Sequence, residues 1–78
     1  MNEKKIVENN IKKYRELRGL SQIELSLIIG KTEKFIENLE SGKYTKALNF
    51  KVLYMITKAL GIEMKDLFTN DKESENNE

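Results

Sequence analysis

Apolar residues recur every three or four positions along most of this 78-residue chain, the spacing that places them on one face of an α-helix. Glycines and helix-capping residues divide this pattern into short segments. The only β-favouring pair outside the segments, Tyr44-Thr45, is too short for a strand. We therefore predict an all-α fold, a compact five-helix bundle with helices at about 4–18, 22–29, 33–40, 50–60 and 62–68.

Residues with strong capping preferences mark the predicted helix boundaries. Ser21 and Glu24 make a Ser-x-x-Glu capping box at the start of the second helix. Thr32 and Asn49 are suitable N-caps for the third and fourth helices. A glycine, the preferred residue just past a helix C-terminus, follows each of the first four helices, at positions 19, 30, 42 and 61.

The second and third helices are short, and only Gly30-Lys31-Thr32 connect them. A glycine in so tight a connection allows two helices to cross at the steep angle of a helix-turn-helix. On the third helix, Ile36 and Leu39 form the inward-facing pair. Together, the two capped helices and their turn predict a helix-turn-helix within the bundle.

Composition excludes several classes of protein. The chain is too short for more than one domain, since a domain typically has about 100–200 residues. It has no cysteine and no histidine, which excludes disulfide frameworks, thiolate zinc sites and histidine-based catalysis. It has no run of about 20 apolar residues that could span a membrane, and its first ten residues lack the apolar region of a signal peptide. We expect a cytoplasmic protein that is not an enzyme and that uses no metal, small-molecule cofactor or membrane.

Charge is distributed unevenly around the formal net value of +1. Residues 71–78 carry four acids and one lysine, a net charge of −3, so residues 1–70 carry +4. The segment 71–78 also contains no apolar side chain whose burial could offset the entropy lost on ordering. We predict a helix-turn-helix domain at residues 1–70 and a disordered acidic tail at residues 71–78.

Five short motifs are similar to those of one known family. They are IKKYR at 11–15, GLSQIEL at 19–25, IENLESGK at 36–43, KALGI at 58–62 and DLF at 66–68. With these motifs, residues 9–68 resemble the Xre/Cro-type helix-turn-helix domain of phage and bacterial repressors. The resemblance implies a repressor-like five-helix fold, binding of double-stranded DNA through helix 33–40 in the major groove, and a homodimer on a palindromic site.

The resemblance also implies base-reading roles in the predicted recognition helix. Glu33, Lys34 and Asn38 fall where base contacts are made near the start and middle of that helix. Lys34 could donate to guanine, Asn38 could pair with adenine or a phosphate, and Glu33 could accept only from cytosine. Phe35 lies beside them, and it could touch a thymine methyl group or equally be a core or partner-facing aromatic.

Other residues are implied to hold the DNA backbone or the fold. The candidate phosphate contacts are Gln22, Ser41, Lys43, Tyr44 and Lys46. Gln22 opens the second helix, where unpaired amides and the helix dipole attract a phosphate, although it could instead be a solvated residue near the cap. Arg15 and Glu40 match the family's positions for an internal ion pair between the first and third helices, and the alternative is two unrelated surface charges.

The helix at 50–60 is apolar on nearly all sides, in two stripes: Phe50, Leu53, Thr57 and Leu60, then Val52, Met55, Ile56 and Ala59. A helix of this kind is buried on both faces, so in so small a domain one face must pack either on the C-terminal helix or on something outside the monomer core. We therefore expect a homodimer through this helix and residues 62–68, with the candidate interface residues Val52, Met55, Ile62 and Met64. Leu48 and Phe50 are expected to anchor the preceding loop to the core, whereas the apolar Ile23 and Leu27 have no assigned role.

The predicted recognition segment is electrically neutral, because residues 21–46 contain four lysines and four glutamates. Carboxylates at Glu33 and Glu37 are unfavourable beside DNA phosphates unless each has a partner. Lys34 or Lys43 could neutralise Glu37, and the helix dipole favours Glu33 at the helix start. The sequence therefore favours a small DNA-binding transcriptional regulator, a homodimeric repressor, and leaves one alternative open: a protein-interaction or antitoxin-like module on the same fold with weak or no DNA binding.

Overall fold

The computed structural model describes residues 2–44, 46 and 48–70. Within these residues the chain forms the helices α1 (Glu3–Leu17), α2 (Gln22–Ile29), α3 (Glu33–Ser41), α4 (Phe50–Leu60) and α5 (Met64–Leu67). No strand occurs in this part of the chain, so the prediction of an all-α, five-helix fold is confirmed. The predicted acidic tail at 71–78 lies outside the described residues.

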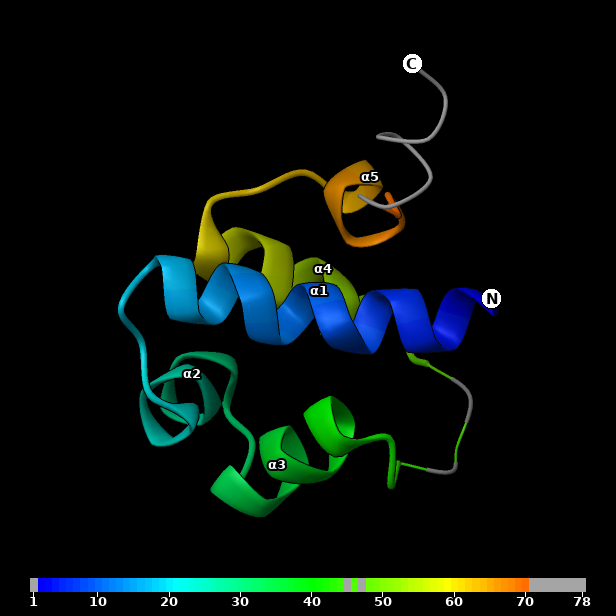
Figure 1. The fold of residues 1–78 in the computed structure, drawn as a ribbon. Helices are drawn as coiled ribbons and strands as arrows, with labels where there is room; N and C mark the ends of the chain where they lie inside the picture. Colours follow the sequence, from blue (N-terminus) through cyan, green and yellow to red (C-terminus); the bar gives the residue numbers. More distant parts are fainter. Residues whose placement is uncertain (1, 45, 47, 71–78) are drawn as a thin grey trace.

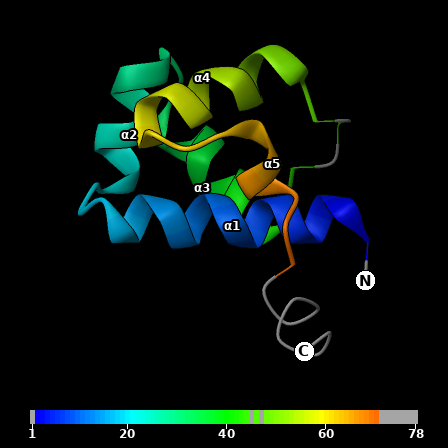
Figure 2. The ribbon, with the colours of Figure 1, turned by 90° about the horizontal axis from the view of Figure 1, so that it is seen from above.

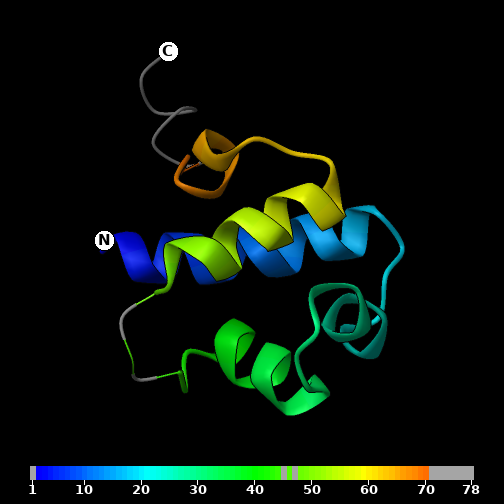
Figure 3. The same ribbon diagram turned by 180° about the vertical axis from the view of Figure 1, so that it is seen from behind.

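The long helix α1 lies across the middle of the molecule (Figure 1). α2 and α3 lie on one side of it and α5 on the other, while α4 runs behind α1, as the reverse view shows (Figure 3). Seen from above, α1 and α4 form opposite sides of the bundle (Figure 2). α3 and α5 both contact α1, and α2 contacts both α3 and α4. This arrangement leaves the outer side of α3 uncovered by any other helix.

Ten apolar side chains, at least one from each helix, form the buried core. They are Val7, Ile11, Leu25, Ile29, Ile36, Leu39, Leu53, Ile56, Leu60 and Leu67, each at most 4% exposed. Burial of one such side chain contributes about 1.5–3 kcal/mol relative to leaving it in water. Because Ile36 and Leu39 are both among these buried residues, the predicted inward-facing pair is confirmed.

The prediction that Phe50 anchors the loop to the core is wrong, because its side chain is 71% exposed. Phe50 is the first residue of α4 and lies at the edge of the bundle, where it lines a shallow groove with Leu48 and Phe68. Leu48 does pack against the core and is half-buried. Apolar periodicity placed Phe50 on the same face of α4 as the buried Leu53, but the core does not extend to the first residue of the helix.

Local capping interactions explain where the helices begin and end. The Ser21–Glu24 capping box is formed in both directions, with donor–acceptor distances of 3.0 and 2.7 Å, and α2 begins where it was predicted. α5 is shorter than the predicted helix at 62–68. The amide of Ile62 donates to the carbonyl of Thr57 at 3.0 Å, which makes it part of the cap that ends α4.

Two polar side chains, one on α1 and one on the residue that caps its C-terminus, bind the ends of other helices. Asn10 is 6% exposed, and its Nδ2 lies 3.3, 2.8 and 2.9 Å from the carbonyl oxygens of Asp66, Leu67 and Thr69. Arg18 donates through Nε to the carbonyl of Leu60 at 2.7 Å, at the end of α4. Carbonyls in the last turn of a helix have no partner within the helix, so these side chains satisfy groups that would otherwise need water. α1 thereby fastens both C-terminal helices.

Asn10→Ala removes the donor and leaves the carbonyls at the end of α5 without their buried partner. We expect the free energy of unfolding, measured by urea denaturation, to fall by about 1–3 kcal/mol. Amide hydrogen exchange should accelerate in α5 more than in α2 or α3, because the lost contacts hold α5 locally. Asn9→Ala, at the exposed neighbouring position, is the control and should change little. Equal effects of the two substitutions would contradict the anchoring role of Asn10.

Candidate nucleic-acid interface

α2 and α3 form the predicted helix-turn-helix, joined by residues 30–32. Gly30 ends α2 with a left-handed φ of +71°, a conformation that side chains disfavour, and Thr32 caps the N-terminus of α3. Ile36 and Leu39 turn one side of α3 into the core. The opposite side is the surface of this motif that is available to a partner (Figure 1).

The predicted base contacts Glu33 and Lys34 are exposed on α3, and Asn38 is half-buried. Lys34 donates through Nζ to Glu37 Oε1 at 2.9 Å. This hydrogen bond raises the pKa of Lys34 and lowers the pKa of Glu37. The positive charge of Lys43 lowers the pKa of Glu37 further. The two side chains of the pair are 72% and 51% exposed, and surface pairs of this kind contribute little to stability. Lys34 can therefore exchange Glu37 for a base edge at small cost.

The carboxylate of Glu40, at the end of α3, is the centre of a buried polar cluster. Arg15 binds it with two parallel hydrogen bonds, Nε to Oε2 at 2.6 Å and Nη2 to Oε1 at 2.9 Å. The side chains of Arg15 and Glu40 are 9% and 3% exposed. The hydrogen bond to Glu40 raises the pKa of Arg15 against the opposing effect of burial. Arg15 also donates through Nη1 to the carbonyl of Leu20 at 2.7 Å. The ion pair implied by the family resemblance is thus present, and it joins α1, α3 and the connection to α2.

Gln22 extends the same cluster to the N-terminus of α2. Its Nε2 donates to Glu40 Oε1 at 3.0 Å, and the residue is half-buried. Sequence reasoning assigned Gln22 to a phosphate and did not foresee this bond, because residues 22 and 40 are far apart in the chain. An amide nitrogen carries two hydrogens, so the bond to Glu40 orients Gln22 and leaves a second hydrogen for an acceptor such as a phosphate.

For Phe35 the sequence left a base contact and a core or partner-facing position equally open. In the structure Phe35 is half-buried and packs against the core. Its ring meets the ring of Tyr44 edge-on, with centroids 5.3 Å apart and planes at 77°. The Lys31 ammonium lies 5.4 Å from the Phe35 centroid. Of the candidate phosphate contacts, Tyr44 is therefore half-buried, while Ser41, Lys43 and Lys46 are exposed.

Basic residues of α1 lie beside the C-terminal end of α3. Lys4 and Lys5 line a shallow hollow of about 360 Å³ together with Ser41 and Gly42. Lys4 is bonded to the buried carboxylate of Glu8 on its own helix, and Lys5 is exposed. The lysines at the start of α1 and the lysine that follows Gly42 thus lie around the same end of α3.

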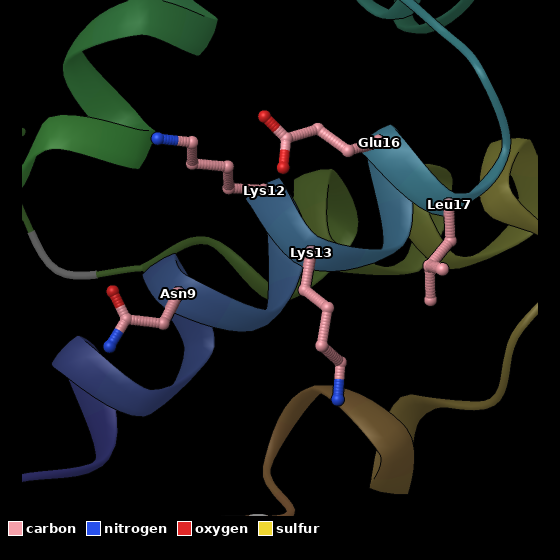
Figure 4. Close-up of a pocket in the computed structure, with 5 residues that line it drawn as sticks. All are labelled: Asn9, Lys12, Lys13, Glu16 and Leu17. Carbon is pink, nitrogen blue, oxygen red and sulfur yellow. The ribbon is translucent and has the colours of Figure 1, made fainter.

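A second hollow, of about 380 Å³, lies on the outer side of α1 and is lined by Asn9, Lys12, Lys13, Glu16 and Leu17 (Figure 4). Lys12 and Glu16 extend to one side of the helix, and Lys13 extends to the other side, toward α5. Side chains that diverge in this way do not converge on a substrate. In the described part of the chain, no group of three or more acidic residues is placed to hold a metal ion. Nor is any helix formed by those residues both long and apolar enough to cross a membrane.

The candidate dimer residues are half-buried at the rim of the core: Val52, Met55, Ile62 and Met64. Larger apolar exposure lies elsewhere, at Leu17, Ile23, Leu27, Ile28, Phe50, Tyr54 and Phe68. Sequence reasoning identified Ile23 and Leu27 as unexplained, and both are at least half exposed. It did not single out the exposure of Phe50, Tyr54 or Phe68, because periodicity identifies a face but not what covers it.

The comparison with protein families decides the identity of this arrangement. A model for helix-turn-helix proteins matches residues 11–67. The chain belongs to the helix-turn-helix family. This helix-turn-helix protein is 34% identical over 62 residues to an uncharacterised HTH-type transcriptional regulator from Methanocaldococcus jannaschii, a match covering 80% of this chain and 91% of the relative.

Two solved structures share the fold of this helix-turn-helix protein. A hypothetical transcription factor, NHTF from Neisseria, superposes with a TM-score of 0.82 at 21% identity, covering 99% of this chain and 86% of that one. The restriction-modification controller protein C.AhdI from Aeromonas hydrophila gives a TM-score of 0.72 at 24% identity, covering 80% and 87%. The Xre/Cro-like resemblance is confirmed, and family membership supports a DNA-binding regulator rather than an enzyme.

Removing one partner of the Arg15–Glu40 pair should destabilise the protein strongly. Arg15→Met leaves the Glu40 carboxylate buried without its cation, and breaking a buried pair in this way costs about 3–5 kcal/mol. The measurement is urea denaturation followed by circular dichroism. In so small a domain this loss is large enough to unfold a substantial fraction of the molecules without denaturant.

The double variant Arg15→Met/Glu40→Leu tests whether the loss comes from the uncompensated charge. Replacing both partners removes the desolvation cost together with the attraction, so the double variant should be more stable than Arg15→Met alone. The single variant Glu40→Leu completes the comparison. If the double variant loses as much unfolding free energy as the two single variants added together, the two residues act independently.

Proposed function

We propose that this protein is a sequence-specific, double-stranded-DNA-binding transcriptional regulator, a homodimeric repressor that acts in the cytoplasm and reads the major groove with α3. The observation that carries the proposal is the uncovered side of α3, a helix that Glu40 holds firmly to α1 and α2. Helix-turn-helix proteins place such a helix in the major groove. The name of the relative from Methanocaldococcus jannaschii supports the same class.

In this proposal, backbone and base contacts come from different parts of the motif. Gln22 at the N-terminus of α2 and the residues Ser41, Lys43, Tyr44 and Lys46 at the other end of α3 would bind phosphates. The N-terminal bases beside that end, Lys5 among them, would add to the positive field. Glu33, Lys34 and Asn38 would face base edges.

Internal partners for the carboxylates support DNA binding in spite of the neutral charge of residues 21–46. Glu40 is bound by Arg15 and Gln22, and its side chain is 3% exposed. Glu24 accepts from the amide of Ser21 in the capping box, and Glu37 accepts from Lys34. Arg15 compensates the charge of Glu40 from outside this segment, so residues 21–46 taken together with Arg15 carry a net charge of +1.

The rim of α4 and α5 is the proposed dimer surface. Val52 and Met55 of α4, Met64 of α5 and Ile62 in the connection between them are half-buried, and α4 and α5 contact each other. A second copy could complete the burial of these side chains. Two-fold symmetry would place two copies of α3 on successive turns of a palindromic site.

One observation favours a second candidate function, an interaction with another protein. Ile23, Leu27 and Ile28 on α2 are 50%, 74% and 56% exposed, which is unusual for one short helix of a monomer that meets only water and DNA. An antitoxin-like or other protein-binding module would use such a surface. Binding to DNA separates the two candidates.

Titration of a random-sequence duplex against salt tests the proposed function. A dimer that makes four to six phosphate contacts should give a log–log slope of about −4 to −5 between affinity and salt concentration. Lys46→Gln removes one contact from each protomer and should make the slope shallower by about 2. Lys58→Gln, an identical charge change on α4, is the matched control and should leave the slope unchanged. Absence of binding at low salt would favour the protein-binding module.

Sedimentation velocity over a concentration series tests the dimer and locates its surface. Met64→Lys places a charge on the proposed α4–α5 interface and should shift the protein toward monomer. Leu27→Lys introduces the same charge on the exposed side of α2 and should leave association unchanged. A wild-type protein that stays monomeric into the high micromolar range would exclude the dimer, and dissociation by Leu27→Lys alone would move the interface to α2.

A further inference from the structure

The ring of Phe35 links two segments that flank α3 in the sequence. Phe35 lies in the first turn of α3, where its amide donates to Thr32 Oγ1 at 3.1 Å. The ammonium group of Lys31, in the turn before α3, lies over the Phe35 ring at 5.4 Å from the ring centroid. The edge-on contact with Tyr44, at 5.3 Å, reaches the chain that follows α3. One half-buried side chain therefore contacts residues on both sides of the recognition helix.

The backbone fixes the start of the segment after α3, and the aromatic contact continues that attachment. The amides of Lys43 and Tyr44 both donate to the carbonyl of Asn38, at 2.9 and 3.2 Å. Gly42 permits the reversal, with a left-handed φ of +83°. The ring of Tyr44 then lies back against the first turn of α3 through Phe35. The exposed Lys43 and Lys46 thus lie next to Tyr44, which is attached to α3 both through its amide and through its ring.

The direction of the contacts argues against a base-reading role for Phe35. A side chain that touches a thymine methyl group must reach outward into the groove, as the exposed Glu33 and Lys34 can. Phe35 instead packs against the core and uses its ring on Lys31 and Tyr44. An aromatic pair in this geometry stabilises a defined arrangement of its two segments beyond the effect of area burial.

We propose that Phe35 is a positioning residue. Through its contacts with Lys31 and Tyr44 it holds the lysines on either side of α3 against the phosphate backbone of duplex DNA, and it does not itself contact a DNA base. This inference rests on the proposed DNA-binding function and assigns Lys31 as a further phosphate contact. Loss of the ring should therefore weaken binding to all sequences alike, because phosphates carry no sequence information.

Three single variants and one double variant test the proposal. Phe35→Leu keeps an apolar side chain against the core and removes the ring. Tyr44→Leu removes the other ring from a residue outside the helices, and Tyr44→Phe keeps the ring while removing only the hydroxyl. Phe35→Leu and Tyr44→Leu should each weaken binding to random-sequence duplex by about two- to tenfold and make the salt slope shallower. Tyr44→Phe keeps the ring and loses only the contact of the hydroxyl, so it should weaken binding less than Tyr44→Leu.

The double variant Phe35→Leu/Tyr44→Leu should lose less affinity than the sum of the two single effects, because both changes break the same ring contact. Selection from a randomised duplex library should return the same preferred sequence for Phe35→Leu as for the wild type. Trypsin should cleave after Lys46 faster in Phe35→Leu than in the wild type, which reports the released segment without DNA. Circular dichroism identifies a variant that fails to fold, in which case the Tyr44 variants carry the test.

Two results would overturn the proposal while leaving the proposed function intact. One is a changed base preference for Phe35→Leu with unchanged affinity for random duplex, which would make Phe35 a base contact. The other is unchanged affinity, slope and cleavage rate in both ring-removing variants. Absence of any binding by the wild-type protein is a different result, and it would overturn the proposed function together with this inference.

Discussion

The whole arrangement depends on the buried carboxylate of Glu40, where α1, α2 and α3 meet. Arg15 binds it through two hydrogen bonds and Gln22 through a third, so a single group from each helix fixes the mutual orientation of all three. An ion pair this well buried is costly to desolvate and is stable only when its geometry is complete. The cluster therefore gives the helix-turn-helix a defined angle against α1, which a small apolar core alone would specify less sharply. A rigid scaffold of this kind is what a recognition helix requires, since base edges are read at hydrogen-bonding distance.

Charge in this protein has meaning only through its internal partners. A count over residues 21–46 gives zero and suggests a surface indifferent to DNA. The structure assigns Glu24 to a cap, Glu37 to Lys34 and Glu40 to Arg15, whereas Lys43 and Lys46 remain exposed beyond α3. Because Arg15 lies outside residues 21–46, its pairing with Glu40 makes the surroundings of α3 one charge more positive than the count indicates, while Glu33 stays exposed. The same reasoning explains why Lys34, held by Glu37 in a solvated pair, is still a reasonable base contact.

Much of the fold could be predicted because its determinants are local. The bounds of α2 and α4 follow from Ser21, Asn49 and the glycines after each helix, whose capping interactions involve neighbours within a few residues. The candidate site was predictable only in part. Residue types could be matched to a family motif, but whether Gln22 meets a phosphate or another side chain depends on what lies next to it in space. Phe50 shows the same limit, since its stripe is correct and its burial is not.

The sequence by itself determined the helices, their caps and the turn between α2 and α3, because each of these depends on contacts between residues close together in the chain. It also determined the family, because the family motifs are short runs of consecutive residues. Tertiary structure alone decided that Asn10 holds α5, that Gln22 shares Glu40 with Arg15, and that Phe35 meets Tyr44 rather than open solvent. Asn10 and Leu67 are 57 positions apart, and no periodicity or capping rule connects such residues. Their pairing is set by how the apolar faces of the helices pack, which brings polar groups together and obliges each buried one to find a partner.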